Sequence, residues 1–169
     1  MKNLFGFLIA TTISISVFGQ FQPTSVVCNL SNDLNETSGL LFFNGKIISH
    51  NDSGGEPKLY EIDTIAGIVI RSIYIENASN VDWEDLAQDS SYIYIADFGN
   101  NNSTRQDLKV YRVSKNDYLN MDTISADTIA FNYADQVKNQ GNYDAEALIA
   151  FNDSLYIFTK NWDNQKTKV

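Results

Sequence analysis

Acidic residues recur at matching positions of this chain, and their spacing could support cation chemistry. Asp82 and Glu84 flank a tryptophan just before an apolar run, and Asp144 and Glu146 flank an alanine in the same way. Glu36 holds the corresponding first position of a third copy. If the copies meet in space, their carboxylates would supply the oxygen ligands that hard cations such as calcium prefer.

These positions belong to an internal repeat. Residues 36–40, 82–86 and 144–148 align without gaps, and each segment ends on a leucine. A second apolar run begins seven residues after each leucine, and a polar turn follows it. A repeat of this kind is typical of an architecture built from similar supersecondary units.

The apolar runs after residue 20 are short, rich in β-branched and aromatic residues, and bounded by Asn, Asp, Ser or Gly, which is typical of strands and turns. An Asn-Gly pair at 44–45 is the strongest short hairpin signal in the chain. We predict no helix, and residues 26–30 are one further candidate strand. The predicted strands are 39–43, 46–49, 58–63, 68–75, 86–88, 92–96, 108–113, 128–133, 147–151 and 154–159.

Four antiparallel strands per unit predict an all-β fold, a β-propeller, of which this chain would form about three blades. Residues 1–19 are then expected to be a signal peptide. Residues 20–169 would be the N-terminal part of a propeller domain, as a fragment that ends inside the third blade. A complete small β-sandwich is the alternative fold.

The N-terminus has the pattern of an export signal, because Lys2 precedes an apolar stretch at 4–17 and a cut is expected before Gln20. The stretch is short for a membrane anchor, which is the alternative. We therefore expect a protein that is secreted, periplasmic or in the cell envelope, with no membrane span after cleavage. Its single cysteine, Cys28, excludes an intrachain disulfide.

The formal charge of −9 disfavours nucleic acid as a partner, because such a surface repels phosphate backbones. It is compatible with binding cations. One histidine and one cysteine do not supply the nitrogen and sulfur ligands that zinc and copper sites use.

Hairpin geometry predicts which side chains meet. In an antiparallel pair, the start of the first strand and the end of the second lie at the same edge. In a propeller, these edges surround one channel mouth. The expected groups are Glu36 with His50, Asn51 and Asp52; Asp82 and Glu84 with Asp97 and Asn100; and Asp144 and Glu146 with Lys160 and Asn161.

Each of these residues has a plainer interpretation. Asp and Asn at strand ends commonly cap turns through hydrogen bonds to the backbone. His50 is a candidate general base beside Asn51 and Asp52, yet a lone turn histidine is also compatible with a simple hydrogen-bonding role. Trp83 and Trp162 are expected to pack between blades.

The motifs at 36–40, 50–55, 82–87, 97–101 and 144–148 resemble those of a group of uncharacterised secreted bacterial β-propeller proteins. The likeness spans residues 36–162. More distantly, the chain is similar to six-bladed calcium-dependent propellers of the gluconolactonase and paraoxonase kind and to the esterase-like domain found with some phytases. The first of these implies calcium at the channel mouth, and the later blades that complete its site are missing here. The matching positions are Glu36, Asn51, Asp97 and Asn100.

Two functions follow as hypotheses. The first is a secreted propeller module that binds a small molecule or an extracellular partner through Asp82, Glu84, Asp144 and Glu146. The second is a calcium-dependent hydrolase of lactone, ester or phosphoester substrates, with its site at the channel mouth and His50 assisting. The fold alone does not decide between them.

Overall fold

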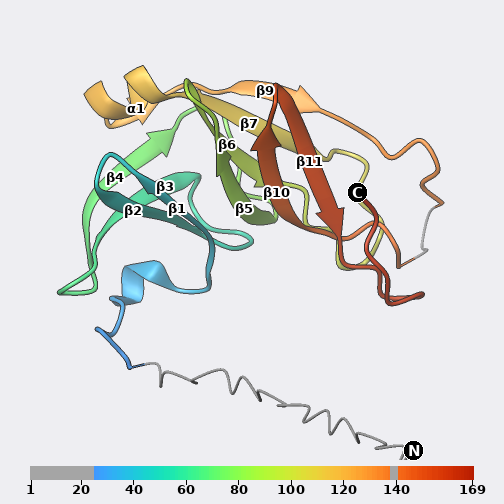
Figure 1. The fold of residues 1–169 in the computed structure, drawn as a ribbon, viewed down its shortest axis with the longest axis horizontal. Helices are drawn as coiled ribbons and strands as arrows, with labels where there is room; N and C mark the ends of the chain where they lie inside the picture. The colour runs from blue at the N-terminus through green and yellow to red at the C-terminus, as the bar shows by residue number, and fades with distance from the viewer. Residues whose placement is uncertain (1–24, 138–140) are drawn as a thin grey trace, which may run out of the picture.

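The computed structural model describes residues 25–137 and 141–169, so the predicted signal peptide lies outside the described residues. Three antiparallel β-hairpins dominate this part of the chain, and each belongs to a different sheet (Figure 1). The prediction of an all-β protein is confirmed. No sheet closes on itself in the described ranges, so the propeller stays a prediction.

The three sheets follow the repeat. The first has the order β1-β2-β3-β4-β8, the second β5-β6-β7-β9, and the third contains β10 and β11. Strand bounds are β1 Thr37–Phe43, β2 Lys46–Asn51, β3 Lys58–Asp63, β4 Ile68–Ile75, β5 Trp83–Gln88, β6 Tyr92–Asp97, β7 Lys109–Ser114, β8 Thr123–Ile124, β9 Asp127–Ala130, β10 Ala145–Phe151 and β11 Ser154–Thr159.

The second sheet lies between the other two (Figure 1). Apolar side chains cover both of its faces. Trp83, Leu86 and Ile95 pack toward the first sheet, where they meet residues such as Ile48. On the opposite face, residues such as Tyr94 pack toward the third sheet. Strand alternation explains this division, because successive side chains of β5 and β6 point to opposite faces.

The connection after β7 departs from the prediction. An α-helix, α1 (Lys115–Asn120), follows β7, and the Ser114 side chain caps it by accepting a hydrogen bond from the Asp117 backbone N–H at 3.4 Å. The chain then adds β8 in parallel to β4, at the edge of the first sheet, before β9 completes the second sheet. The expectation of no helix is therefore wrong.

Residues 26–30 form no strand, contrary to the prediction. They precede a 3-10 turn, η1 (Asn32–Leu34), and pack beside the turn between β3 and β4. The Ser31 backbone N–H donates to the Gly67 carbonyl at 2.8 Å, and a Cβ on Gly67 would lie 2.0 Å from the Asn29 carbonyl oxygen. These contacts tie the segment to a turn of the first sheet.

A β-bulge lies at the start of the first strand in all three hairpins. The register shifts between Thr37 and Leu40 in β1, between Trp83 and Asp85 in β5, and between Ala145 and Ala147 in β10. The last two bulges contain Glu84 and Glu146. Because a bulge re-aims a side chain away from the regular ladder, it positions these carboxylates at the edge of their sheets.

Candidate metal site

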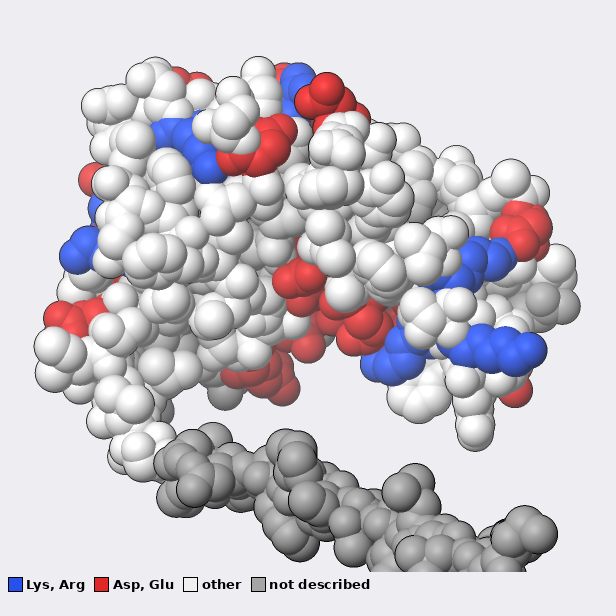
Figure 2. Space-filling view, viewed as in Figure 1, with Lys and Arg blue, Asp and Glu red and all other residues white. Residues whose placement is uncertain are grey.

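Glu84 lies at the centre of two overlapping groups of carboxylates. In one group, oxygens of Asp52, Asp82 and Glu84 lie within 4.8 Å of one another, and in the other, oxygens of Glu84, Asp144 and Glu146 do. Acidic side chains gather in the hollow between the first and third sheets (Figure 2). These clusters could hold a metal ion, and their ligand atoms come from all three sheets.

The second sheet positions its two carboxylates through β5 and the end of β6. Trp83 pairs with Asp97, and the Gly99 backbone N–H donates to the Asp82 carbonyl at 3.1 Å. The Asp97 carboxylate also accepts a hydrogen bond from the Asp82 backbone N–H at 3.1 Å. Together with the pairing of Asp85 and Ala96, this arrangement fixes the backbone on both sides of the Glu84 bulge.

Gly99 leaves the space into which the carboxylates reach. A Cβ at this position would lie 2.2 Å from Glu84 Oε1 and 2.4 Å from Asp82 Oδ2, far inside normal contact. No residue with a side chain fits there without displacing both carboxylates. Glycine at position 99 therefore lets both carboxylates lie against the backbone, and a Cβ there would push the ends of these two side chains away.

Burial and mutual repulsion raise the pKa values of these acids. Burial, followed by repulsion from Glu146, Asp82 and other carboxylates, raises the pKa of Glu84 to about 8. Burial and the neighbouring Asp52 raise the pKa of Asp82 to about 6. Burial also raises the pKa of Glu146, which Lys160 opposes. A cation would relieve this repulsion by binding the ionised forms.

The cluster on the side of the third sheet already has partners. Asp144 accepts hydrogen bonds from the Asn100 backbone N–H and from Trp162 Nε1, each at 2.8 Å. The Lys160 ammonium contacts Glu146 and lies 3.8 Å from Asp144 Oδ2. This side therefore carries its own positive charge.

The cluster on the side of the first sheet has no such cation. Asp52 Oδ1 is buried without a hydrogen-bond partner among the described residues. The described part of the chain shows no ion pair to Asp52, Asp82 or Glu84. An unpaired buried carboxylate oxygen is costly, and a bound cation would offset that cost. The group of Asp52, Asp82 and Glu84 is thus the better candidate for holding an ion.

Asp97 and Asn100, which were expected to bind metal, instead hold the loop next to the site in place. The fully buried Asp97 pairs with Arg105 at 3.0 Å, and burial raises its pKa while Arg105 opposes that shift. Asn100 accepts a hydrogen bond from the Arg105 backbone N–H at 2.9 Å through its side-chain oxygen. Asp97 Oδ1 and the Asn100 side-chain oxygen are therefore both engaged by Arg105, in the loop that carries Gly99.

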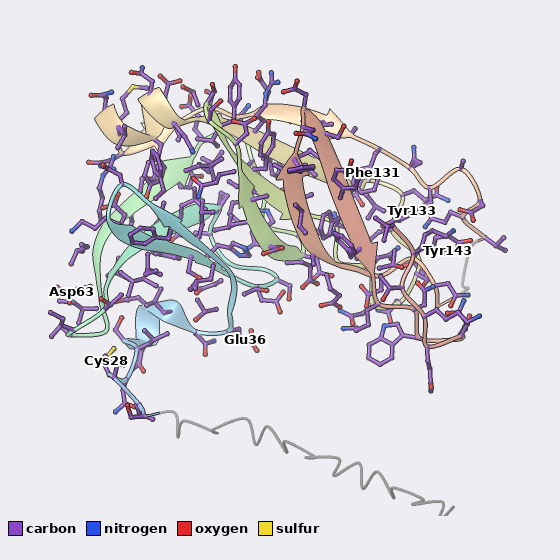
Figure 3. The ribbon with its side chains drawn as sticks, in the orientation of Figure 1. Cys28, Glu36, Asp63, Phe131, Tyr133 and Tyr143 are labelled. Carbon is purple, nitrogen blue, oxygen red and sulfur yellow. The ribbon has the colours of Figure 1, made fainter. Side chains whose placement is uncertain are left out.

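The other two expected metal ligands lie outside the clusters. Glu36 is exposed at the junction between η1 and β1, with a φ of 55° (Figure 3). The Asn51 side-chain amide donates to the Asp33 carbonyl at 2.9 Å. The first sheet contributes Asp52 instead, whose backbone N–H donates to the Glu36 carbonyl at 2.9 Å.

His50 is completely buried between the first two sheets. Its ring packs edge-on against Trp83 with centroids 5.6 Å apart, and Nδ1 lies 2.9 Å from the Asn51 carbonyl. Burial lowers the pKa of His50, which favours the neutral imidazole. A substrate at the surface has no direct access to this ring.

Asp52 was expected at this edge of the first sheet but not as a ligand, and Gly99 was not singled out at all. Both stand in polar turns directly after the second strand of a hairpin, in Asn51-Asp52-Ser53-Gly54 and Phe98-Gly99-Asn100. Lys160 follows the second strand of the third hairpin at the position equivalent to Asp52. The second unit holds Phe98 at this position, so the charged residues of the first and third units were the available signal for Asp52. Gly99 stands one residue later and had no such signal.

A groove of about 570 Å³ adjoins the clusters on the side of the third sheet. Glu146, Lys160 and the half-exposed Trp162 line one end of it, with the Lys160 ammonium 4.7 Å from the centre of the Trp162 ring. The groove therefore combines charge with an exposed aromatic face beside the carboxylates.

Comparison with protein-family models gives no match to this chain, and comparison with curated proteins gives no significant match either. Among the residues that the structure describes, no helix has the length and apolar content needed to cross a bilayer.

Proposed function

We propose that this chain is a ligand-binding module that holds a divalent cation between adjacent sheets of a propeller-like stack. The observation that carries the proposal is the convergence of the Asp52, Asp82 and Glu84 carboxylates, of which the last two lie against Gly99. Three carboxylates leave coordination positions open on an ion that prefers six to eight oxygens. An oxygen-rich ligand would fill those positions.

Calcium is the cation that the chemistry of the site favours. Every candidate ligand atom is a carboxylate oxygen, and the groups contain no nitrogen or sulfur donor. Such a set suits calcium, and a flexible, partly exposed site suits it better than the strict octahedron of magnesium. The proposed export of the chain would place it where calcium is plentiful.

The groove beside Glu146 and Trp162 is the proposed place for the body of the ligand. A polar ligand with one flat apolar face would stack on Trp162 while an oxygen of the same ligand completes the ion's coordination. This arrangement favours a small molecule over nucleic acid, whose phosphates the acidic surface repels.

Direct calcium binding tests this proposal. Titration calorimetry on chelator-treated chain should show one bound calcium per chain, and Glu84→Gln should abolish it. Glu36→Gln is the matched control, because this exposed glutamate lies outside the clusters, and it should bind as the unchanged chain does. Absence of binding to the unchanged chain, or equal loss in both variants, would contradict the proposal.

A calcium-dependent hydrolase is the second candidate. The observation that favours it is the pKa of Asp82, raised to about 6 in a cleft, since groups with shifted pKa values concentrate at catalytic sites. The complete burial of His50 weighs against its expected role as a general base that assists hydrolysis. Turnover of aryl ester and lactone substrates that requires calcium and is lost in Asp82→Asn would favour the hydrolase.

A further inference from the structure

The first and third sheets each expose one apolar face, whereas the second sheet is covered on both sides. On the first sheet, Leu40 and Phe42 are each 64% exposed. On the third sheet, Ile149 is 49% and Phe151 61% exposed. These faces lie at opposite ends of the stack of three sheets (Figure 1).

The two interfaces inside the stack use the same repeat positions. Between the first and second sheets, Gly39 packs so closely that a Cβ on it would lie 2.6 Å from the Leu86 backbone nitrogen. Between the second and third sheets, the Asp85 carboxylate accepts a hydrogen bond from the Leu148 backbone N–H at 2.7 Å. Asp85 is the repeat equivalent of Gly39, and Leu148 is the equivalent of Leu86.

Each exposed face carries the residues that form one side of the two internal interfaces. Leu40 is the first-sheet equivalent of Leu86 and Leu148, which face the preceding sheet. Ala147 is the third-sheet equivalent of Gly39 and Asp85, which face the following sheet. The third sheet therefore offers one side of the repeated interface, and the first sheet offers the other.

Part of the first sheet's face is already covered, which limits where a partner can dock. Leu34 of η1 packs on Tyr60 and Ile62 at the β3 side of this face. Leu40 and Phe42 on β1 remain open. The open area thus includes the strand of the first sheet that is equivalent to β5 and β10, which form the internal interfaces.

We propose that a second copy of this chain docks its first sheet on the third sheet, with Leu40 of one copy against Ala147 of the other. A second copy is the proposed occupant because its first sheet carries the unoccupied complement of this surface. The contact is head-to-tail, so it closes into a ring if the rotation permits and otherwise extends as a filament. This inference goes beyond cation binding. Ala147 also lines the groove beside Trp162, so a docked copy and the proposed ligand would compete for this part of the third sheet.

Mixing two variants tests the proposal. Phe42→Asp damages the face of the first sheet and Phe151→Asp that of the third, and both residues are exposed, so folding should be preserved. Sedimentation velocity should show that the unchanged chain self-associates, that each variant alone is monomeric, and that an equal mixture forms a one-to-one dimer. The dimer is expected because one intact face of each kind remains in the mixture.

Ile65→Asp is the matched control, because Ile65 is 86% exposed in the turn between β3 and β4, away from both faces. It should associate as the unchanged chain does. A monomeric unchanged chain, variants that associate alone, or a mixture that stays monomeric would each overturn the proposal.

Discussion

Gly99 and Glu84 show how single residues build the candidate site. Glu84 occupies a bulge, which turns its carboxylate out of the ladder, and Gly99 leaves the volume that the carboxylate needs. Asp82 enters the same volume from the residue before β5. The site therefore depends on the absence of a side chain at Gly99 as well as on the acidic residues.

Gly99→Ala should lower cation affinity about 10- to 100-fold, the usual cost of disturbing the groups around a metal site. The new Cβ displaces the Glu84 and Asp82 oxygens. Gly55→Ala is the control, because the nearest atom to a Cβ there lies 3.6 Å away. Calcium titration of both variants checks this, and equal affinities would show that the space at Gly99 does not matter.

The raised pKa of Glu84 predicts how stability depends on pH without cations. The folded chain holds this proton up to about pH 8, whereas the unfolded chain releases it near 4.5. Because the folded state binds more protons between these values, the free energy of unfolding should fall as pH rises through this window. Partial exposure limits the fall to on the order of 1 kcal/mol.

Urea denaturation in chelator at pH 5 and pH 8.5 measures this fall, and Glu84→Gln should remove most of it. Asp82, with a pKa of about 6, changes stability in the same direction over the lower part of the window. Stability that rises with pH in the chelated chain would contradict the expected state of Glu84.

At the scale of elements, the hairpins were predictable and their connections were not. The repeat of leucines and apolar triplets placed β1 with β2, β5 with β6 and β10 with β11, because alternation and turn residues are local signals. Helix α1 is only six residues long, and β8 pairs with β4 from a distant part of the chain. Neither carries a strong local pattern.

The positions of Asp82, Glu84, Asp144 and Glu146 at the strand edges could be predicted from the sequence. The sequence did not show whether Glu36 or Asp52 supplies the first sheet's carboxylate to the candidate metal site. Glu36 shares its repeat position with Asp82, yet its positive φ turns the chain into β1 and leaves the side chain in solvent. The bulge that directs Glu84 toward both clusters arises from the pairing of β5 with β6. It could not be predicted from the residues of β5 alone.

The loop between β6 and β7 depends on a buried ion pair, which Arg105→Met should break at a cost of about 3 kcal/mol. The change leaves Asp97 buried without its guanidinium partner. Chemical denaturation measures the loss. Arg112→Met is the control, since its pair with Asp127 is largely exposed and should contribute less than about 1 kcal/mol. Equal losses would argue against a structural role for Asp97.

At the scale of the whole molecule, a shared cation would link sheets that otherwise repel one another through their acids. Calcium at about 100 times its Kd should raise the free energy of unfolding by about 2.7 kcal/mol. Asp52→Asn should lose most of that gain, whereas Asp153→Asn, in the exposed turn between β10 and β11, should retain it. Thermal unfolding with and without calcium measures both, and a similar gain in both variants would contradict a linking ion.

The most direct measurement is an anomalous difference map from crystals of the chain soaked in manganese, a divalent stand-in with a usable signal. We predict one strong peak bound by carboxylate oxygens of Asp52, Asp82 and Glu84, so that the first and second sheets share one ion. A map without a peak at these three residues, or with its peak at Glu36, would contradict the account.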